Sequence, residues 1–154
     1  MGSAYRRYRK DSPEAVASVL AALLLGDGRL DPREIEFMDH VGVFGIVGVP
    51  RETFLRVASE VYAAMQGETV PAASQGARLD AALEAVRDRD RQLLVSAVLL
   101  YLAEADHAIS AREVALVRQV FERWRVSAAE LERRVGVPVA RTRRILDSGH
   151  APAS

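Results

Sequence analysis

The sequence contains no cysteine among its 154 residues. Disulfides, thiolate metal sites and thiol redox chemistry are therefore excluded. Lysine is nearly absent as well, because Lys10 is the only one and every other basic residue is arginine. Net charge is also missing, since 21 basic residues balance 21 acidic ones. The chain as a whole lacks the basic character that is typical of proteins that bind nucleic acid or anionic lipid.

Long hydrophobic runs are missing too. The longest ones, residues 15–25 and 93–103, are shorter than the roughly 20 residues that a transmembrane helix needs. No apolar secretory segment directly follows the arginine-rich N-terminus. These absences predict a cytoplasmic protein without a membrane span. The basic arm at the N-terminus leaves peripheral contact with an anionic membrane surface open.

Apolar residues recur at helical spacing along most of the chain, and no stretch alternates with period two. We therefore predict an all-α bundle of about seven helices. Two helix starts are especially clear. Ser12-Pro13-Glu14 places a capping serine before proline and an acid, and Ser127 precedes Glu130 by three residues, as in a capping box.

A short acidic stretch occurs twice, at residues 25–35 and 104–114. Each copy ends an apolar run and begins an amphipathic one, so each predicts a helix, an acidic turn and a second helix. The spacing is constant at 79 residues (106 − 27 and 113 − 34), and it pairs Asp27 with Asp106, Leu30 with Ile109, and Glu34 with Glu113. We predict two pseudo-symmetric repeats whose apolar helices, 15–25 and 93–103, pack on each other.

The same pattern predicts the domain organisation. A stretch rich in Gly, Pro and Ser separates two comparable halves and predicts a flexible linker. The predicted parts are a basic arm at 1–11, a helical domain at 12–135 with halves 12–66 and 77–135 and a linker at 67–76, and a C-terminal extension at 136–154 with one short helix.

The acidic turns are candidates for a cation site. Each copy matches only the second half of an EF-hand calcium loop, so neither copy supplies the six to eight oxygens that calcium prefers. Placed side by side, the two turns would pool hard oxygen ligands for calcium, magnesium or manganese. The candidate ligands are Asp27, Asp31, Glu34, Glu104, Asp106 and Glu113. A purely structural interpretation stays open, because helix caps and tight turns use the same residue types.

The segment LLLGDGRLDPREIEFM, followed later by YLAEADHAISAREVALV, resembles the tellurite-resistance TerB family and its TerB-like domains. The resemblance covers about residues 12–131. It implies an all-α fold with pseudo-two-fold repeats and a role in bacterial stress resistance. It also implies metal binding by acidic residues, here Asp27, Asp31, Glu34, Asp106 and Glu113. His107 and Ser110 depart from the pattern, where the family has a glycine and an acid.

The expected function is that of a non-catalytic, TerB-like stress-response protein that works with other proteins of an assembly. Carboxylates repel the tellurite oxyanion, and a chain without cysteine cannot reduce it through thiols. Catalysis is not expected, because His40, His107 and His150 have neither a metal spacing nor a neighbouring nucleophile. The sequence leaves the oligomeric state undetermined.

Two alternatives stay open. In the first, the acidic turns are structural and an exposed apolar face binds a partner protein, with Phe44, Ile46 and Val47 as candidates. In the second, residues 129–146 form a helix-turn-helix that binds nucleic acid through Arg141, Arg143 and Arg144. The second is less favoured, because the chain is neutral and two glutamates, Glu130 and Glu132, lie in the first helix of that segment.

Overall fold

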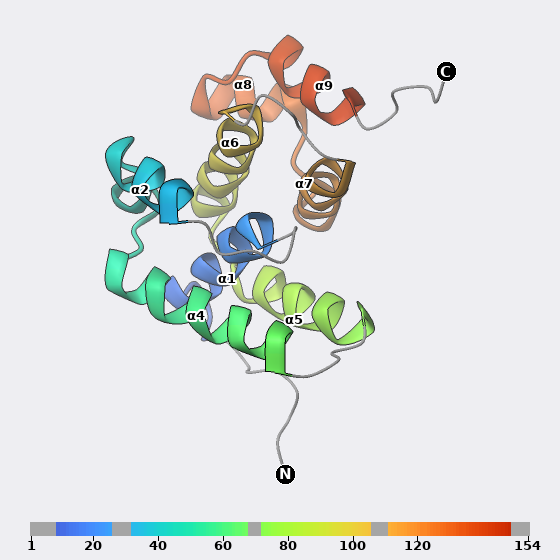
Figure 1. The fold of residues 1–154 in the computed structure, drawn as a ribbon. Helices are drawn as coiled ribbons and strands as arrows, with labels where there is room; N and C mark the ends of the chain where they lie inside the picture. Colours follow the sequence, from blue (N-terminus) through green and yellow to red (C-terminus); the bar gives the residue numbers. More distant parts are fainter. Residues whose placement is uncertain (1–8, 26–31, 68–71, 106–110, 149–154) are drawn as a thin grey trace. The chain divides into compact units, whose positions relative to one another are not determined.

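The computed structural model describes residues 9–25, 32–67, 72–105 and 111–148, and every regular element in these ranges is an α-helix (Figure 1). The all-α prediction is confirmed. The described residues form nine helices rather than about seven. One of the additional helices is short and lies between two glycines at residues 42 and 48. The chain divides into two compact units, residues 1–88 and 89–154, which are described separately.

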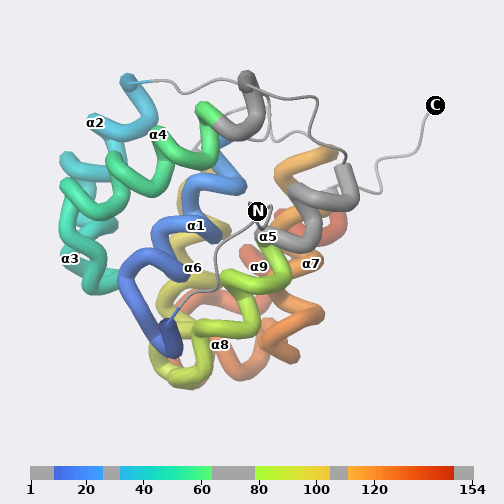
Figure 2. Tube along the Cα trace, turned by 90° about the horizontal axis from the view of Figure 1, so that it is seen from below, coloured from blue at the N-terminus to red at the C-terminus, as the bar shows by residue number. Residues whose placement is uncertain are grey.

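Unit 1 contains α1 (Pro13–Leu24), α2 (Pro32–His40), α3 (Val43–Val47), α4 (Arg51–Gly67) and α5 (Ala72–Ala85). The centre of this unit is α1, which packs against α4 and α5 (Figures 1 and 2). Its residues Ala15 to Leu20 are buried on every side, Ser18 included. Such burial is what a helix that is apolar all round requires.

The start of α1 agrees with its sequence signature. Ser12 has an extended backbone, and its hydroxyl accepts a hydrogen bond from the Ala15 N–H at 3.2 Å. Pro13 is the first helical residue, where its missing N–H costs no hydrogen bond. The predicted cap is therefore confirmed.

Helical structure occupies part of the predicted linker. The sequence predicts a flexible linker at 67–76, whereas α4 extends to Gly67 and α5 begins at Ala72. The prediction gave too much weight to Gly76. Residues 72–75 are Ala, Ala, Ser and Gln, and the strong helix propensity of alanine and glutamine outweighs a single glycine. Because α5 packs against α1, it lies in the same unit as α1.

The glycine-flanked apolar stretch is mostly core. Phe44 and Val47 of α3 are buried, and the Phe44 ring lies 5.2 Å from that of Phe54 in α4. Only Ile46 of the three candidate exposed residues is exposed. Gly42 and Gly48 flank α3 with positive φ, a conformation that glycine adopts without strain. The chain thereby turns sharply enough for a five-residue helix to bury three of its side chains, Val43, Phe44 and Val47.

Asp11 connects the start of unit 1 to its end. Its carboxylate accepts hydrogen bonds from the backbone N–H groups of Arg87 (2.6 Å) and Asp88 (2.8 Å), while its own N–H donates to the Ala85 carbonyl. Asp11 adopts a left-handed backbone conformation, with φ at +54°. Asp11 belongs to the predicted N-terminal arm at 1–11, and these contacts connect it to the end of α5 and to residues 87 and 88.

Unit 2 contains α6 (Arg89–Ala105), α7 (Ala111–Trp124), α8 (Ala128–Val135) and α9 (Val139–Ser148). Its central helix is α6, which packs against the other three (Figure 1). The inner face of α7 consists of five buried residues at helical spacing, Val114, Val117, Val120, Phe121 and Trp124. The Ser127 hydroxyl accepts a hydrogen bond from the Glu130 N–H at 3.1 Å, which confirms the predicted cap of α8.

The helices were compared with the requirements of a membrane span. In the described ranges, no helix is both long enough and apolar enough to cross a bilayer. The expected absence of a membrane span agrees with this finding.

Candidate functional site

Glu34 and Glu113 occupy matching positions in two helices. Glu34 is the third residue of α2, and Glu113 is the third residue of α7. The next residue in each helix, Ile35 or Val114, is buried and fixes the start of the helix in the core of its unit. A carboxylate in a first turn is stabilised by the helix dipole. Their positions are thus compatible with both a capping role and a ligand role.

Three other candidate ligands, Asp27, Asp31 and Asp106, lie outside the described residues, which resume at Pro32 and at Ala111. Their assignment as cation ligands stays a prediction. The same holds for the suggestion that the two acidic turns lie side by side, because it concerns how the two units are arranged.

Glu104 has a well-defined environment at the C-terminal end of α6. Its carboxylate accepts a hydrogen bond from Arg144 Nη2 at 3.1 Å and is paired with the Arg141 guanidinium. The hydrogen bond from Arg141 lowers the pKa of Glu104 from its ordinary value, an effect that outweighs the opposing effect of partial burial. Two arginines of α9 therefore already neutralise this carboxylate, and a cation would have to displace them.

Glu104 is also the point at which the two copies of the acidic stretch differ. Its counterpart 79 residues earlier (104 − 79 = 25) is Leu25, which is buried. The glutamate thus has a structural task in unit 2, where it binds α9, and this task has no equivalent in the first copy.

The predicted donor set has the right chemistry for a hard cation, since all six members are carboxylates. In the described ranges, however, no group of three or more His, Cys, Asp or Glu side chains lies close enough together to hold a metal ion. Within each unit, the described candidates, Glu34 in unit 1 and Glu104 and Glu113 in unit 2, are therefore not by themselves a metal site. Asp27, Asp31 and Asp106 would have to complete it.

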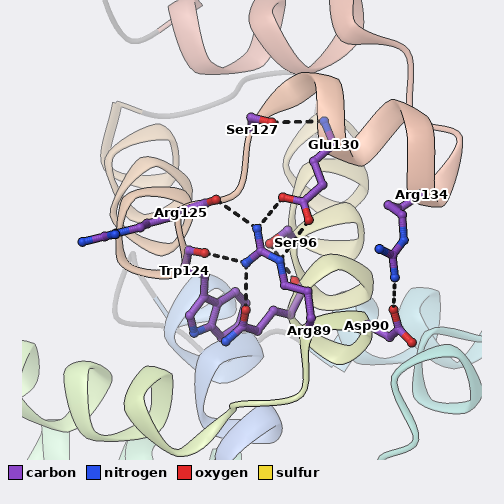
Figure 3. A network of polar contacts seen from close by, with 9 residues as sticks. Arg89, Asp90, Ser96, Trp124, Arg125, Ser127, Glu130 and Arg134 are labelled. Atoms are coloured by element: carbon purple, nitrogen blue, oxygen red, sulfur yellow. Dashed lines mark hydrogen bonds and ion pairs between the residues drawn. The ribbon is translucent and has the colours of Figure 1, made fainter.

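Arg89, the first residue of α6, forms a polar network in unit 2 that sequence reasoning missed (Figure 3). Its guanidinium donates to the backbone carbonyls of Trp124 at 2.6 Å and Arg125 at 3.0 Å. It also donates to Glu130, through Nε at 3.0 Å and through Nη2, and to the Gln92 side chain at 2.9 Å. One side chain therefore connects the start of α6, the end of α7 and the first turn of α8.

Glu130 binds Arg89 through its carboxylate. The hydrogen bond from Arg89 lowers the pKa of Glu130, and partial burial opposes this effect more weakly. The predicted capping box assigned this side chain to the Ser127 N–H. The only sequence signal for Arg89 is a charged residue at the start of a mostly apolar helix, and it does not identify partners that lie 35 to 41 residues away.

The segment from α8 to α9 has the outline of a helix-turn-helix. Three residues, 136–138, join the two helices, and Gly136 closes α8 with φ at +86° and an N–H that donates to the carbonyls of Leu131 and Glu132. The Glu132 carboxylate accepts a hydrogen bond from the Val139 N–H at 3.1 Å, at the start of α9. The helix predicted at residues 139–146 is present as α9.

Thr142 contributes to the packing of α9 in an unusual way. It is fully buried, and its hydroxyl is the only buried side-chain polar atom in the described ranges that lacks a hydrogen-bond partner. An unsatisfied buried hydroxyl costs about 1–3 kcal/mol.

Thr142→Val keeps the shape and removes the hydroxyl, so we expect it to raise the free energy of unfolding by about 1 kcal/mol in urea denaturation. Thr142→Ser keeps the hydroxyl and is expected to destabilise. Destabilisation by valine would show that the hydroxyl has a partner.

Comparisons with protein-family models, with curated proteins and with solved structures find no match. The resemblance to the TerB family therefore stays an expectation that rests on the acidic repeats and their flanking apolar helices.

Proposed function

We propose that this chain is a non-catalytic, TerB-like stress-response protein that binds a divalent cation through its two acidic turns. The observation that carries the proposal is the matched placement of Glu34 and Glu113. Each is the third residue of a helix, each precedes a buried aliphatic residue, and each follows one copy of the acidic stretch in the sequence. Two equivalent half-sites are a reasonable source of the six or more oxygens that a hard cation needs.

Glu104 is not one of the proposed cation ligands. Because Arg141 and Arg144 bind it, we assign it to the docking of α9 and not to the first coordination sphere. The proposed ligands are then Asp27, Asp31, Glu34, Asp106 and Glu113. All are carboxylates, so the proposed site would prefer calcium, magnesium or manganese to softer metals.

Thermal unfolding of chelator-treated protein tests the proposal. A ligand that binds only the native state stabilises it by about 2.7 kcal/mol at 100 times its Kd. We therefore expect calcium, magnesium or manganese to raise the Tm, and Asp27→Asn or Glu34→Gln to reduce the increase. No rise in Tm with any of the three cations, at concentrations up to about 10 mM, contradicts the proposal.

A control separates loss of a ligand from loss of a favourable helix-terminal charge. Glu52 also lies in the first turn of a helix, α4, and is not part of an acidic turn. Glu52→Gln removes a comparable interaction with a helix dipole. It should lower the Tm slightly and leave the cation-dependent increase unchanged, whereas Glu34→Gln should change both.

A scaffold function is the second candidate. It is favoured by two exposed apolar side chains, Phe37 of α2 and Ile46 of α3, which lie on helices that pack against each other. The cation titration distinguishes the candidates, because a scaffold with purely structural turns gains no stability from a cation.

A further inference from the structure

The connection between α8 and α9 fits the dimensions of a DNA-binding helix-turn-helix. In that motif a turn of three or four residues, often with glycine, joins two packed helices, and the second helix enters the major groove. Here α8 and α9 pack against each other and both pack on α6. The turn has three residues and begins with Gly136 in a left-handed conformation. The length of the turn, its glycine and the packing of the two helices therefore agree with the motif.

The orientation of α9 leaves a basic face exposed. Thr142 and Ile145 are buried, whereas Ala140, Arg143 and Arg144 are exposed on the same helix. The C-terminal end of α9 is held by Arg118 of α7, whose Nε donates to the Leu146 carbonyl at 2.9 Å. The helix is thus fixed on its inner side, and its outer side presents Ala140, Arg143 and Arg144, followed by Asp147 near its C-terminal end.

Charge in this segment is strongly positive. Residues 125–144 contain six arginines and two acidic residues, Glu130 and Glu132. Both carboxylates are engaged inside the unit, Glu130 by Arg89 and Glu132 by the start of α9. Glu130 is therefore an internal partner of Arg89, whereas Glu132 stays exposed while its carboxylate accepts the hydrogen bond at the start of α9. The exposed charge of the motif is predominantly that of arginines, the residues that best match phosphate geometry.

We propose that α9 binds duplex DNA in the major groove, with Arg143 and Arg144 of α9 and Arg133 of α8 contacting phosphates. Arg144 is paired with Glu104, but its side chain is 71% exposed. Exposed ion pairs contribute less than about 1 kcal/mol, so a phosphate can replace this glutamate. Glu104 accordingly weakens DNA binding by competing for Arg144.

Fluorescence anisotropy with a labelled duplex of about 20 base pairs tests the proposal on the full chain, in chelator so that cation binding plays no part. We expect binding at about 20 mM salt, with log K falling against log salt at a slope of about −2 to −3 for three phosphate contacts. Arg143→Glu should reduce the slope by about 1 or more and weaken binding by roughly tenfold. Arg51→Glu makes the same charge change in unit 1, beside Asp39, and should alter binding by less than about twofold.

Glu104→Gln provides a test in the opposite direction. It releases Arg141 and Arg144, so it should tighten DNA binding by about two- to fivefold, whereas a purely structural role of this contact predicts no gain. Circular dichroism confirms that each variant is folded. The proposal is overturned by any of three results: no binding at low salt, equal losses in Arg143→Glu and Arg51→Glu, or equally tight binding to phosphatidylserine vesicles.

Discussion

Replacing Arg89 with alanine is expected to lower the free energy of unfolding by about 2–3 kcal/mol. The variant leaves the Trp124 and Arg125 carbonyls and the Glu130 carboxylate without their donor. The side chain of Arg89 is 36% exposed and that of Glu130 is 18% exposed, so water replaces only part of what is lost. Urea denaturation followed by circular dichroism and by the fluorescence of Trp124, the only tryptophan, measures the effect.

Arg134→Ala is the matched control. Arg134 of α8 forms a second ion pair between α8 and α6, with Asp90 in the first turn of α6. The side chains of Arg134 and Asp90 are 49% and 73% exposed. An exposed pair of this kind contributes less than about 0.5 kcal/mol. Arg89→Lys keeps the charge and loses the planar fork, so its stability should fall between wild type and Arg89→Ala. If Arg89→Ala and Arg134→Ala lowered the free energy of unfolding equally, the Arg89 network would contribute no more stability than a surface ion pair.

The same network makes stability depend on pH. Arg89 lowers the pKa of Glu130 below its ordinary value of 4.5, which the unfolded chain retains. The stability that this pair contributes is therefore present above about pH 4.5 and is lost as the pH falls through the lower, folded-state pKa. The stability of Arg89→Ala should depend less on acidic pH than that of the wild type. The difference in the free energy of unfolding between the two proteins should therefore shrink as the pH falls below about 4.5.

Phe54→Ala is expected to cost about 3–5 kcal/mol, the largest single-residue effect that we predict. Phe54 is fully buried on α4, which packs against α1, and its ring lies against Phe44 of α3. Truncation to alanine removes this contact and leaves a cavity beside Phe44. The cavity can close only if α3 moves. The midpoint of urea unfolding should fall, with a loss of helical circular dichroism at lower denaturant.

Phe37→Ala controls for the loss of an aromatic ring as such. Phe37 lies on α2 in the same unit and is partly exposed. Its truncation should cost less than about 1 kcal/mol. If both variants lost the same stability, the burial of Phe54 would not be the cause of its effect.

Local features of the sequence predicted much of the fold. Two caps, at Ser12 and Ser127, and the apolar spacing of α7 depend on residues that are close together in the sequence. They can therefore be predicted without tertiary information. The early start of α5 is also a local feature, because the helix propensity of residues 72–75 outweighs the single Gly76. The burial of Phe44 could not be predicted in this way. It depends on packing against Phe54 of α4, and a glycine-rich stretch does not indicate which apolar residues a neighbouring helix will cover.

The candidate site was less predictable for the same reason. Six carboxylates follow from turn chemistry, but the partner of Glu104 lies 37 to 40 residues away in α9 (141 − 104 and 144 − 104). No periodicity connects residues at such separations. Sequence reasoning therefore identified Glu104 as a ligand on its spacing alone, while the structure shows that its carboxylate binds two arginines.

The use of arginine in place of lysine has a practical consequence. Arg89 and Arg118 each direct several N–H groups at backbone carbonyls, which the single ammonium of a lysine does less well. The chain has one lysine, Lys10, and it is exposed. Amine-reactive dyes will therefore modify side chains only at Lys10 and leave the arginine networks intact. A fluorophore at this position, next to Asp11, labels the only lysine side chain without an engineered cysteine.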